Sequence, residues 1–172
     1  MKKKFQTILV DPLGTAWGEH IIIPDDVVGF YKHNNVQRLL CSVNGLQNYH
    51  CALMPAGEGV YFIHVNKELR KKLKVESGDK VQIILQPDES KYGMYVPKEF
   101  TELIKMDPEG DKYFHQLTPG KQRSLLHIMG KPKSSETRLK KTYLIVEFLK
   151  LNKGNLDYKA MNEYFKTEGK NF

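Results

Sequence analysis

The hydrophobic pattern of this chain changes character once, near Lys105, and this change limits the folds that it can adopt. Before Lys105, short apolar segments rich in Val, Ile, Leu and Tyr alternate with turns of Gly, Pro, Asn or Asp, which is typical of strands. After it, apolar residues recur about every 3.6 positions, which is typical of amphipathic helices. The sequence therefore predicts an α+β protein, with a β-barrel domain over residues 1–105 and a helical unit over residues 106–172 that packs on it.

Six or seven strands at this spacing favour a small Greek-key-like barrel, with a sandwich as the alternative. Pro24 and Pro97 each follow an apolar segment and precede an acidic first turn, where a helix tolerates proline best. Asn66 is a capping residue for a third short helix. We expect these helices to be lids on the ends of the barrel. The predicted strands are residues 5–10, 16–23, 36–43, 46–54, 59–65, 79–85 and 92–96.

Capping residues and stop signals divide the second part of the chain into four helices. The longest is expected to open at Ser134 or Ser135 and to end near Leu151, ahead of Gly154. The other three are expected over residues 107–116, over residues 119–130 behind the capping residue Thr118, and within residues 156–166.

The amino terminus starts with a basic run, but its apolar stretch, residues 5–10, is too short for a signal peptide core or a membrane span. We therefore expect a cytoplasmic protein without membrane insertion. Cys41 and Cys51 flank Asn44-Gly45, a strong hairpin signal. The register set by that turn would place Cys51 opposite Arg38 and point the two thiols to opposite faces. We expect free, buried thiols and no disulfide.

The net charge of +7 is concentrated in one helical segment. Residues 121–153 hold nine Lys or Arg and two acidic residues, whereas the rest of the chain holds eighteen of each. The loop and helix start near residue 134 form a candidate anion site, because serine hydroxyls and the free N–H groups of a helix start attract anions. The candidate residues for binding an anion or a nucleic acid are Lys131, Lys133, Ser134, Ser135, Arg138, Lys140 and Lys141.

The cations of this helix do not form one stripe. At about 100° per residue, Arg138, Lys140 and Lys141 spread over more than about 150° of the helix, and Leu139 interrupts them. Surfaces that follow a phosphate backbone are normally more focused. The preferred interpretation is a solvated helix entrance in which Arg138 pairs with a carboxylate of the fold.

No catalytic or metal-binding pattern stands out in the sequence. The six histidines lack the spacing of a zinc site, and no nucleophile elbow or phosphate-binding loop is found. We expect no enzymatic activity, no cofactor and no metal. Trp17 and Tyr49 are candidates for a small-molecule pocket at the mouth of the barrel, although aromatic residues of this kind more commonly belong to the core.

Two segments resemble known families. "GLQNYHCALMPAGEGVYFIHVNKELRKKLKVESGDKVQIIL" and "YVPKEFTELI" resemble a bacterial and archaeal barrel domain of unknown function, and "FHQLTPGKQRSLLHIMGKPKSSETRLKKTYLIVEFLKLNKG" is similar to the bacteriocin-protection, YdeI or OmpD-associated family. The resemblance implies a cytoplasmic protein linked to envelope stress or bacteriocin tolerance, and it supplies no catalytic residues. The positions that match the helical motif are Leu117, Pro119, Ser124, Lys131, Glu136, Thr137 and Arg138.

These observations favour a non-enzymatic cytoplasmic binding or stress- and bacteriocin-protection protein, whose partner is an unknown protein or a small anionic ligand. The alternative is a nucleic-acid-associated protein that uses the basic segment 121–153. The segment "LKVESGDKVQIIL" is also similar to DNA-binding swapped-hairpin regulators, but Gly78-Asp79 supplies only a tight turn that many barrels need.

Overall fold

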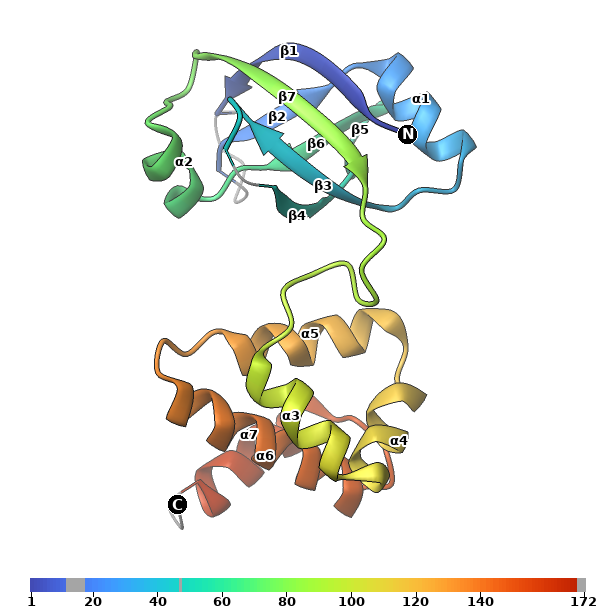
Figure 1. Ribbon diagram of the computed structural model, residues 1–172, viewed down its shortest axis with the longest axis vertical. Coiled ribbons are helices and arrows are strands. Elements are labelled where there is room, and N and C mark those ends of the chain that lie inside the picture. Colours follow the sequence, from blue (N-terminus) through green and yellow to red (C-terminus); the bar gives the residue numbers. More distant parts are fainter. Residues whose placement is uncertain (12–17, 47, 170–172) are drawn as a thin grey trace. The chain divides into compact units, whose positions relative to one another are not determined.

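The computed structural model describes residues 1–11, 18–46 and 48–169, and the chain forms two compact units, Met1–Gly93 and Met94–Phe172 (Figure 1). The sequence predicted a division after Lys105. The division lies earlier because helix α3 (Lys98–Met106) packs on helices α4 (Pro108–Gln116) and α6 (Ser135–Leu151) of the second unit. Helix α3 therefore belongs to the helical unit.

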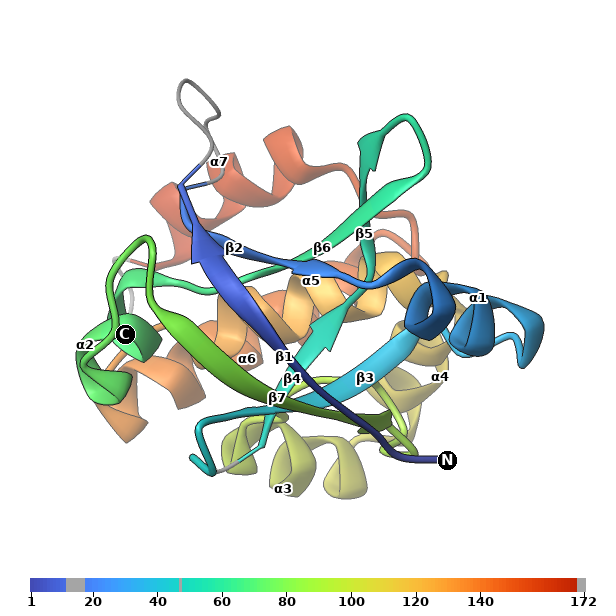
Figure 2. The ribbon, with the colours of Figure 1, turned by 90° about the horizontal axis from the view of Figure 1, so that it is seen from above.

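The first unit is a nearly closed, seven-stranded antiparallel barrel, which confirms the predicted α+β class. The strand order is β4-β3-β7-β1-β2-β6-β5. Strand β1 serves both halves of the sheet, since its residues 3–8 pair with β7 and its residues 9–10 pair with β2 (Figure 2). The strands are β1 (Lys3–Val10), β2 (His20–Ile23), β3 (Arg38–Val43), β4 (Tyr49–Ala52), β5 (Met54–Gly57), β6 (Val60–His64) and β7 (Lys80–Pro87).

Two short helices of the barrel unit begin where the sequence predicted. Helix α1 (Asp25–His33) follows Pro24, and helix α2 (Lys67–Leu73) is capped by Asn66, whose Oδ1 accepts a hydrogen bond from the backbone N of Leu69 at 2.9 Å. Helix α1 is joined to the sheet by the buried Tyr31, whose hydroxyl donates to the Leu85 carbonyl at 2.8 Å. The barrel core therefore includes one face of α1.

The segment after β7 does not form the strand predicted over residues 92–96. Instead, Gly93 has a φ of 66°, and its carbonyl accepts a hydrogen bond from Arg38 Nη2 at 2.7 Å. A Cβ at Gly93 would lie 2.9 Å from Arg38 Nε, so glycine permits this close approach. The strand count is still seven because β5, a strand that was not predicted, begins at the last residue of the predicted segment 46–54 and continues to Gly57.

The turn between β3 and β4 has the predicted conformation. Asn44 and Gly45 have φ values of 49° and 76°, and the Val43 carbonyl accepts a hydrogen bond from Leu46 N at 2.9 Å. Positive φ at both central positions is what a tight hairpin turn of this kind requires.

The pairing of β3 with β4 is shifted by one residue from the register that this turn alone predicts. Cys41 pairs with Tyr49, and Cys51 pairs with Leu39 and not with Arg38. Because side chains alternate between the faces of a strand, the shift turns both thiols to the same, inner face of the barrel. The predicted opposite orientation is wrong, whereas the prediction that both cysteines are free and buried is confirmed.

In the helical unit, α6 packs on each of the other four helices. The predicted caps are confirmed at Thr118, whose Oγ1 accepts a hydrogen bond from Lys121 N, and at Ser134, whose Oγ accepts one from Thr137 N. Two further helices complete the unit, α5 (Pro119–Gly130) and α7 (Tyr158–Glu168). Across the described ranges, no helix combines the length and apolar character that a membrane span requires.

Candidate functional site

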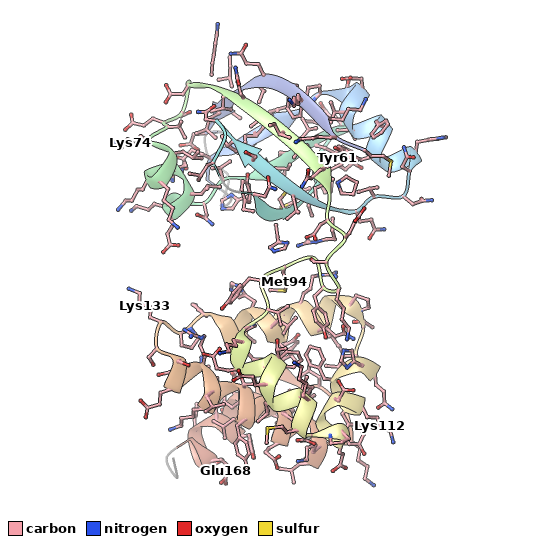
Figure 3. The ribbon with its side chains drawn as sticks, in the orientation of Figure 1. Tyr61, Lys74, Met94, Lys112, Lys133 and Glu168 are labelled. Atoms are coloured by element: carbon pink, nitrogen blue, oxygen red, sulfur yellow. The ribbon has the colours of Figure 1, made fainter. Side chains whose placement is uncertain are left out.

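The loop before α6 is tied to the helix that follows it. Ser134 caps the helix, and Arg138 Nη1 donates to the backbone carbonyls of Pro132 and Lys133 at 3.2 and 2.7 Å. The Lys131 and Lys133 side chains are exposed, and Figure 3 shows Lys133 pointing away from the helices. The geometry of the predicted helix entrance is therefore fixed mainly by Arg138.

The anion bound at this helix start is a carboxylate of the chain itself. Glu99 on α3 is only 7% exposed, and its Oε1 accepts hydrogen bonds from Ser135 Oγ at 2.6 Å and Arg138 Nη2 at 2.7 Å. The hydrogen bonds from Arg138, followed by that from Ser135, lower the pKa of Glu99 to about 2. The prediction that Arg138 pairs with a carboxylate of the fold is confirmed.

Sequence reasoning did not identify Glu99 as part of this site. An acidic residue in the first turn of a helix normally stabilises the helix dipole, so Glu99 looks ordinary in its local sequence. Only the packing of α3 on α6 brings it to Ser135 and Arg138.

The other cations of the basic segment divide into two groups. Lys140 Nζ donates to the Gly169 carbonyl at 2.6 Å, and Lys150 Nζ binds Asp107 and Glu147 at 3.1 and 2.6 Å. In contrast, three of the candidate lysines make no side-chain hydrogen bond or ion pair to any residue that the structure describes. These are Lys131, Lys133 and Lys141. The basic segment is therefore partly structural and partly solvated.

A groove of about 820 Å³ lies along the amino-terminal half of α6. Two of its apolar side chains, Leu139 and Tyr143, remain 49% and 38% exposed, although they belong to the central helix of the unit. Three helices contribute to the lining. The lining residues are Leu103 of α3, Glu136, Thr137, Leu139, Lys140, Lys141, Tyr143 and Leu144 of α6, Phe165 of α7, and Gly169.

The groove combines an apolar wall with a weakly cationic rim. Lys140 and Lys141 contribute two positive charges, and Glu136 contributes one negative charge, so the net charge of the lining is +1. The sequence analysis treated Leu139 only as an interruption of the basic residues. The sequence did contain a signal for this groove, because Leu139 and Tyr143 lie one helical turn apart on a side of α6 that also carries lysines.

The pocket predicted at the barrel mouth has only one candidate in the described structure. Trp17 lies outside the described residues. Tyr49 packs against the barrel core, and its hydroxyl oxygen is buried. Two hollows on the barrel unit, of about 350 and 530 Å³, do not include Tyr49 in their linings.

The two thiols lie next to each other in the barrel core. The hydrogen bond with Cys41, together with burial, raises the pKa of the Cys51 thiol, and the same hydrogen bond lowers the pKa of Cys41. Cys51 Sγ also donates to the Leu39 carbonyl at 3.4 Å. Both thiols therefore belong to the packing of the sheet.

One histidine of the barrel unit, His50, is oriented by the nearly buried carboxylate of Asp88. His50 Nδ1 lies 2.6 Å from Asp88 Oδ2, and Ser90 hydrogen-bonds the other carboxylate oxygen. Within the described ranges, no three side chains of His, Cys, Asp or Glu gather in a way that could hold a metal ion.

Comparisons with known proteins agree with the division into two units. Residues 5–85 match the family model described as Domain of unknown function (DUF1905), and residues 94–151 match the model described as Bacteriocin-protection, YdeI or OmpD-Associated. A comparison with curated proteins gave no match. The chain is therefore similar to a DUF1905 domain over its barrel unit and to the bacteriocin-protection, YdeI or OmpD-associated family over its helical unit, which is the order that the resemblance suggested.

Proposed function

We propose that this protein is a non-enzymatic binding protein of the stress- or bacteriocin-protection type, and that its ligand occupies the groove along α6. The description of the second family suggests a protection-type role. The observation that carries the proposal of a binding site is the pair of exposed apolar side chains, Leu139 and Tyr143, inside a groove of about 820 Å³.

The exposure of Leu139 and Tyr143 contrasts with the burial of most apolar side chains of α6, although Leu151 at the carboxyl end of the helix is also exposed. Single exposed apolar residues on a surface need no explanation. Apolar side chains that line a common hollow are different, because such hollows are where ligands bury apolar surface. The groove is also continuous with charged groups, which would orient a ligand.

A non-enzymatic role is supported by the way that Glu99 is used. This carboxylate has a strongly lowered pKa, which in many enzymes marks a functional site. Here its oxygens are bound by Arg138 and Ser135 between two helices, so its ionisation stabilises the packing. We propose the cytoplasm as the compartment, which the two free thiols support and cell fractionation would test.

The proposed site can be tested with N-phenyl-1-naphthylamine, an uncharged apolar fluorophore, titrated into the full chain. We expect Leu139→Ser to weaken binding by about tenfold, because it removes most of one apolar contact. Leu151→Ser is the matched control, since Leu151 is 67% exposed on the same helix and does not line the groove. Equal loss in the two variants, or no saturable binding to the unmodified chain, would overturn the proposal.

The nucleic-acid alternative has fewer cations available than the sequence suggested. Arg138 and Lys140 bind groups of the helical unit, which leaves Lys131, Lys133 and Lys141 from the original set. We therefore expect no retention on immobilised DNA or RNA at about 50 mM salt. Retention that falls by orders of magnitude between about 50 and 200 mM salt would favour nucleic acid as the partner.

A further inference from the structure

We propose that the ligand of the α6 groove is a long-chain fatty acid in its anionic form. This inference rests on the proposed function, because it names the chemical class that the same groove would take. It follows from the apolar wall, the net charge of the lining and the position of one lysine.

The wall of the groove suits a flexible hydrocarbon chain. Leu103, Leu139, Tyr143 and Phe165 contribute apolar surface from three helices, and the volume of about 820 Å³ lies within the range of small-molecule sites. Because the groove is open and not enclosed, its apolar contacts lie along a surface that a chain can follow. Each methylene group that becomes fully buried raises the affinity by about fourfold.

The charges of the lining favour a head group with a single negative charge. Lys140 and Lys141 are partly offset by Glu136, so the net charge of +1 matches a carboxylate better than a doubly charged phosphate monoester. Glu136 would also repel a second negative charge.

Lys141 is the residue best placed to bind the carboxylate. Its side chain is half-buried, and no residue within the described ranges forms a hydrogen bond or ion pair with it. A lysine of this kind lays its methylene stem along apolar surface and keeps its ammonium group at the rim. The acyl chain would then lie against Leu139 and Tyr143, with the head group at Lys141.

The test compares ligands that share a twelve-carbon chain and differ in the head group, each used below its micelle concentration with the full chain. Calorimetry would measure dodecanoate, dodecyl phosphate, dodecanol and dodecyltrimethylammonium at neutral pH. We expect dodecanoate to bind most tightly, at least about tenfold better than the cationic ligand. Tighter binding of the cationic ligand or of the phosphate monoester would overturn the inference.

Variants separate the head-group contact from the apolar contact. Lys141→Met should lower the affinity for dodecanoate by about threefold to fivefold and leave the affinity for dodecanol unchanged. Lys133→Met is the matched control, because Lys133 is an exposed lysine of the same unit that does not line the groove. Equal effects of the two variants would mean that Lys141 does not bind the carboxylate.

The outcomes also distinguish this inference from the proposed function. Saturable binding of the uncharged fluorophore in the groove, without preference for dodecanoate, would support the groove as a binding site and overturn the inference that its ligand is a fatty acid. If neither the fluorophore nor dodecanoate bound, both the proposed binding site and the fatty-acid inference would be overturned. Binding to phosphatidylglycerol vesicles without binding of monomeric dodecanoate would identify the groove as a membrane contact and overturn the inference.

Discussion

Arg138 on α6 donates hydrogen bonds to the carboxylate of Glu99 on α3 from two nitrogen atoms. Nη2 lies 2.7 Å from Oε1, and Nε lies 3.0 and 3.1 Å from the two carboxylate oxygens. The two residues are 39 positions apart in the sequence, and the exposed fractions of their side chains are 21% and 8%. A paired charge at low exposure is stabilised by its partner, and removal of either partner leaves the other poorly solvated. This pair therefore joins the first helix of the helical unit to its central helix.

Glu99→Gln should lower the free energy of unfolding of the helical unit, because the amide cannot neutralise Arg138. Glu102→Gln is the matched control, since Glu102 lies on the same helix in an exposed pair with Lys98 and should cost less than about 1 kcal/mol. We expect the effect at Glu99 to be several times larger, as measured by urea unfolding with far-UV circular dichroism. Similar effects at the two positions would show that the pair contributes little.

The stability of the helical unit should depend on pH through Glu99. Its pKa is about 2 in the folded protein against an ordinary value of 4.5, so the unfolded chain binds the proton more readily. The contribution of the pair is fully present above about pH 5 and is lost as the pH falls through about 2. We expect the difference in the free energy of unfolding between the unmodified chain and Glu99→Gln to become smaller as the pH falls from about 5 to about 2. A constant difference would contradict the lowered pKa.

Gly110→Ala should destabilise the helical unit, although alanine is the better helix former. A Cβ at Gly110 would overlap the buried Val146 and approach Asp107 Oδ2 to 2.9 Å, which disturbs both the contact with α6 and the cap of α4. We expect a loss of about 1–3 kcal/mol. Gly120→Ala in α5 meets no atom within 4 Å and should be neutral or stabilising by up to about 1 kcal/mol. Thermal unfolding of the two variants provides the comparison.

Asn44→Ala should destabilise the barrel for two reasons. Alanine tolerates the φ of 49° less well than asparagine, and the hydrogen bond from Gln82 N to Asn44 Oδ1, 2.8 Å long, is lost. Asn35→Ala is the matched control, because Asn35 has a similar φ of 54°. We expect Asn44→Ala to cost about 1 kcal/mol more than Asn35→Ala in urea unfolding. Equal costs would show that the side-chain hydrogen bond is unimportant.

The sequence predicted the helices after residue 106 closely, because their boundaries depend on local chemistry. Thr118 and Ser134 cap the helices that they were expected to cap, and Pro119 follows its cap directly. The start of a helix is determined by residues within one turn of it, so a single sequence is sufficient to identify it.

Features that depend on distant residues were not predictable in this way. The shift between β3 and β4 reverses the face of Cys51, yet Asn44 and Gly45 form the turn that their sequence indicates. The segment 92–96 has the composition of a strand, but the carbonyl of Gly93 within it accepts a hydrogen bond from Arg38.

The candidate site shows the same limit. The cluster of serines and Arg138 indicated a candidate anion site at the start of α6, and the structure places the carboxylate of Glu99 there. The identity of that anion could not be read from the sequence, because Glu99 reaches it only through the packing of α3.

The use of an internal carboxylate at the start of α6 has an evolutionary consequence. Ser135 and Arg138 already form a receptor of the right geometry and charge, and one side chain of the same polypeptide fills it. Shortening that side chain would empty the receptor without altering the residues that build it. A single codon change at position 99 would therefore remove the carboxylate while leaving in place the two residues that bind it.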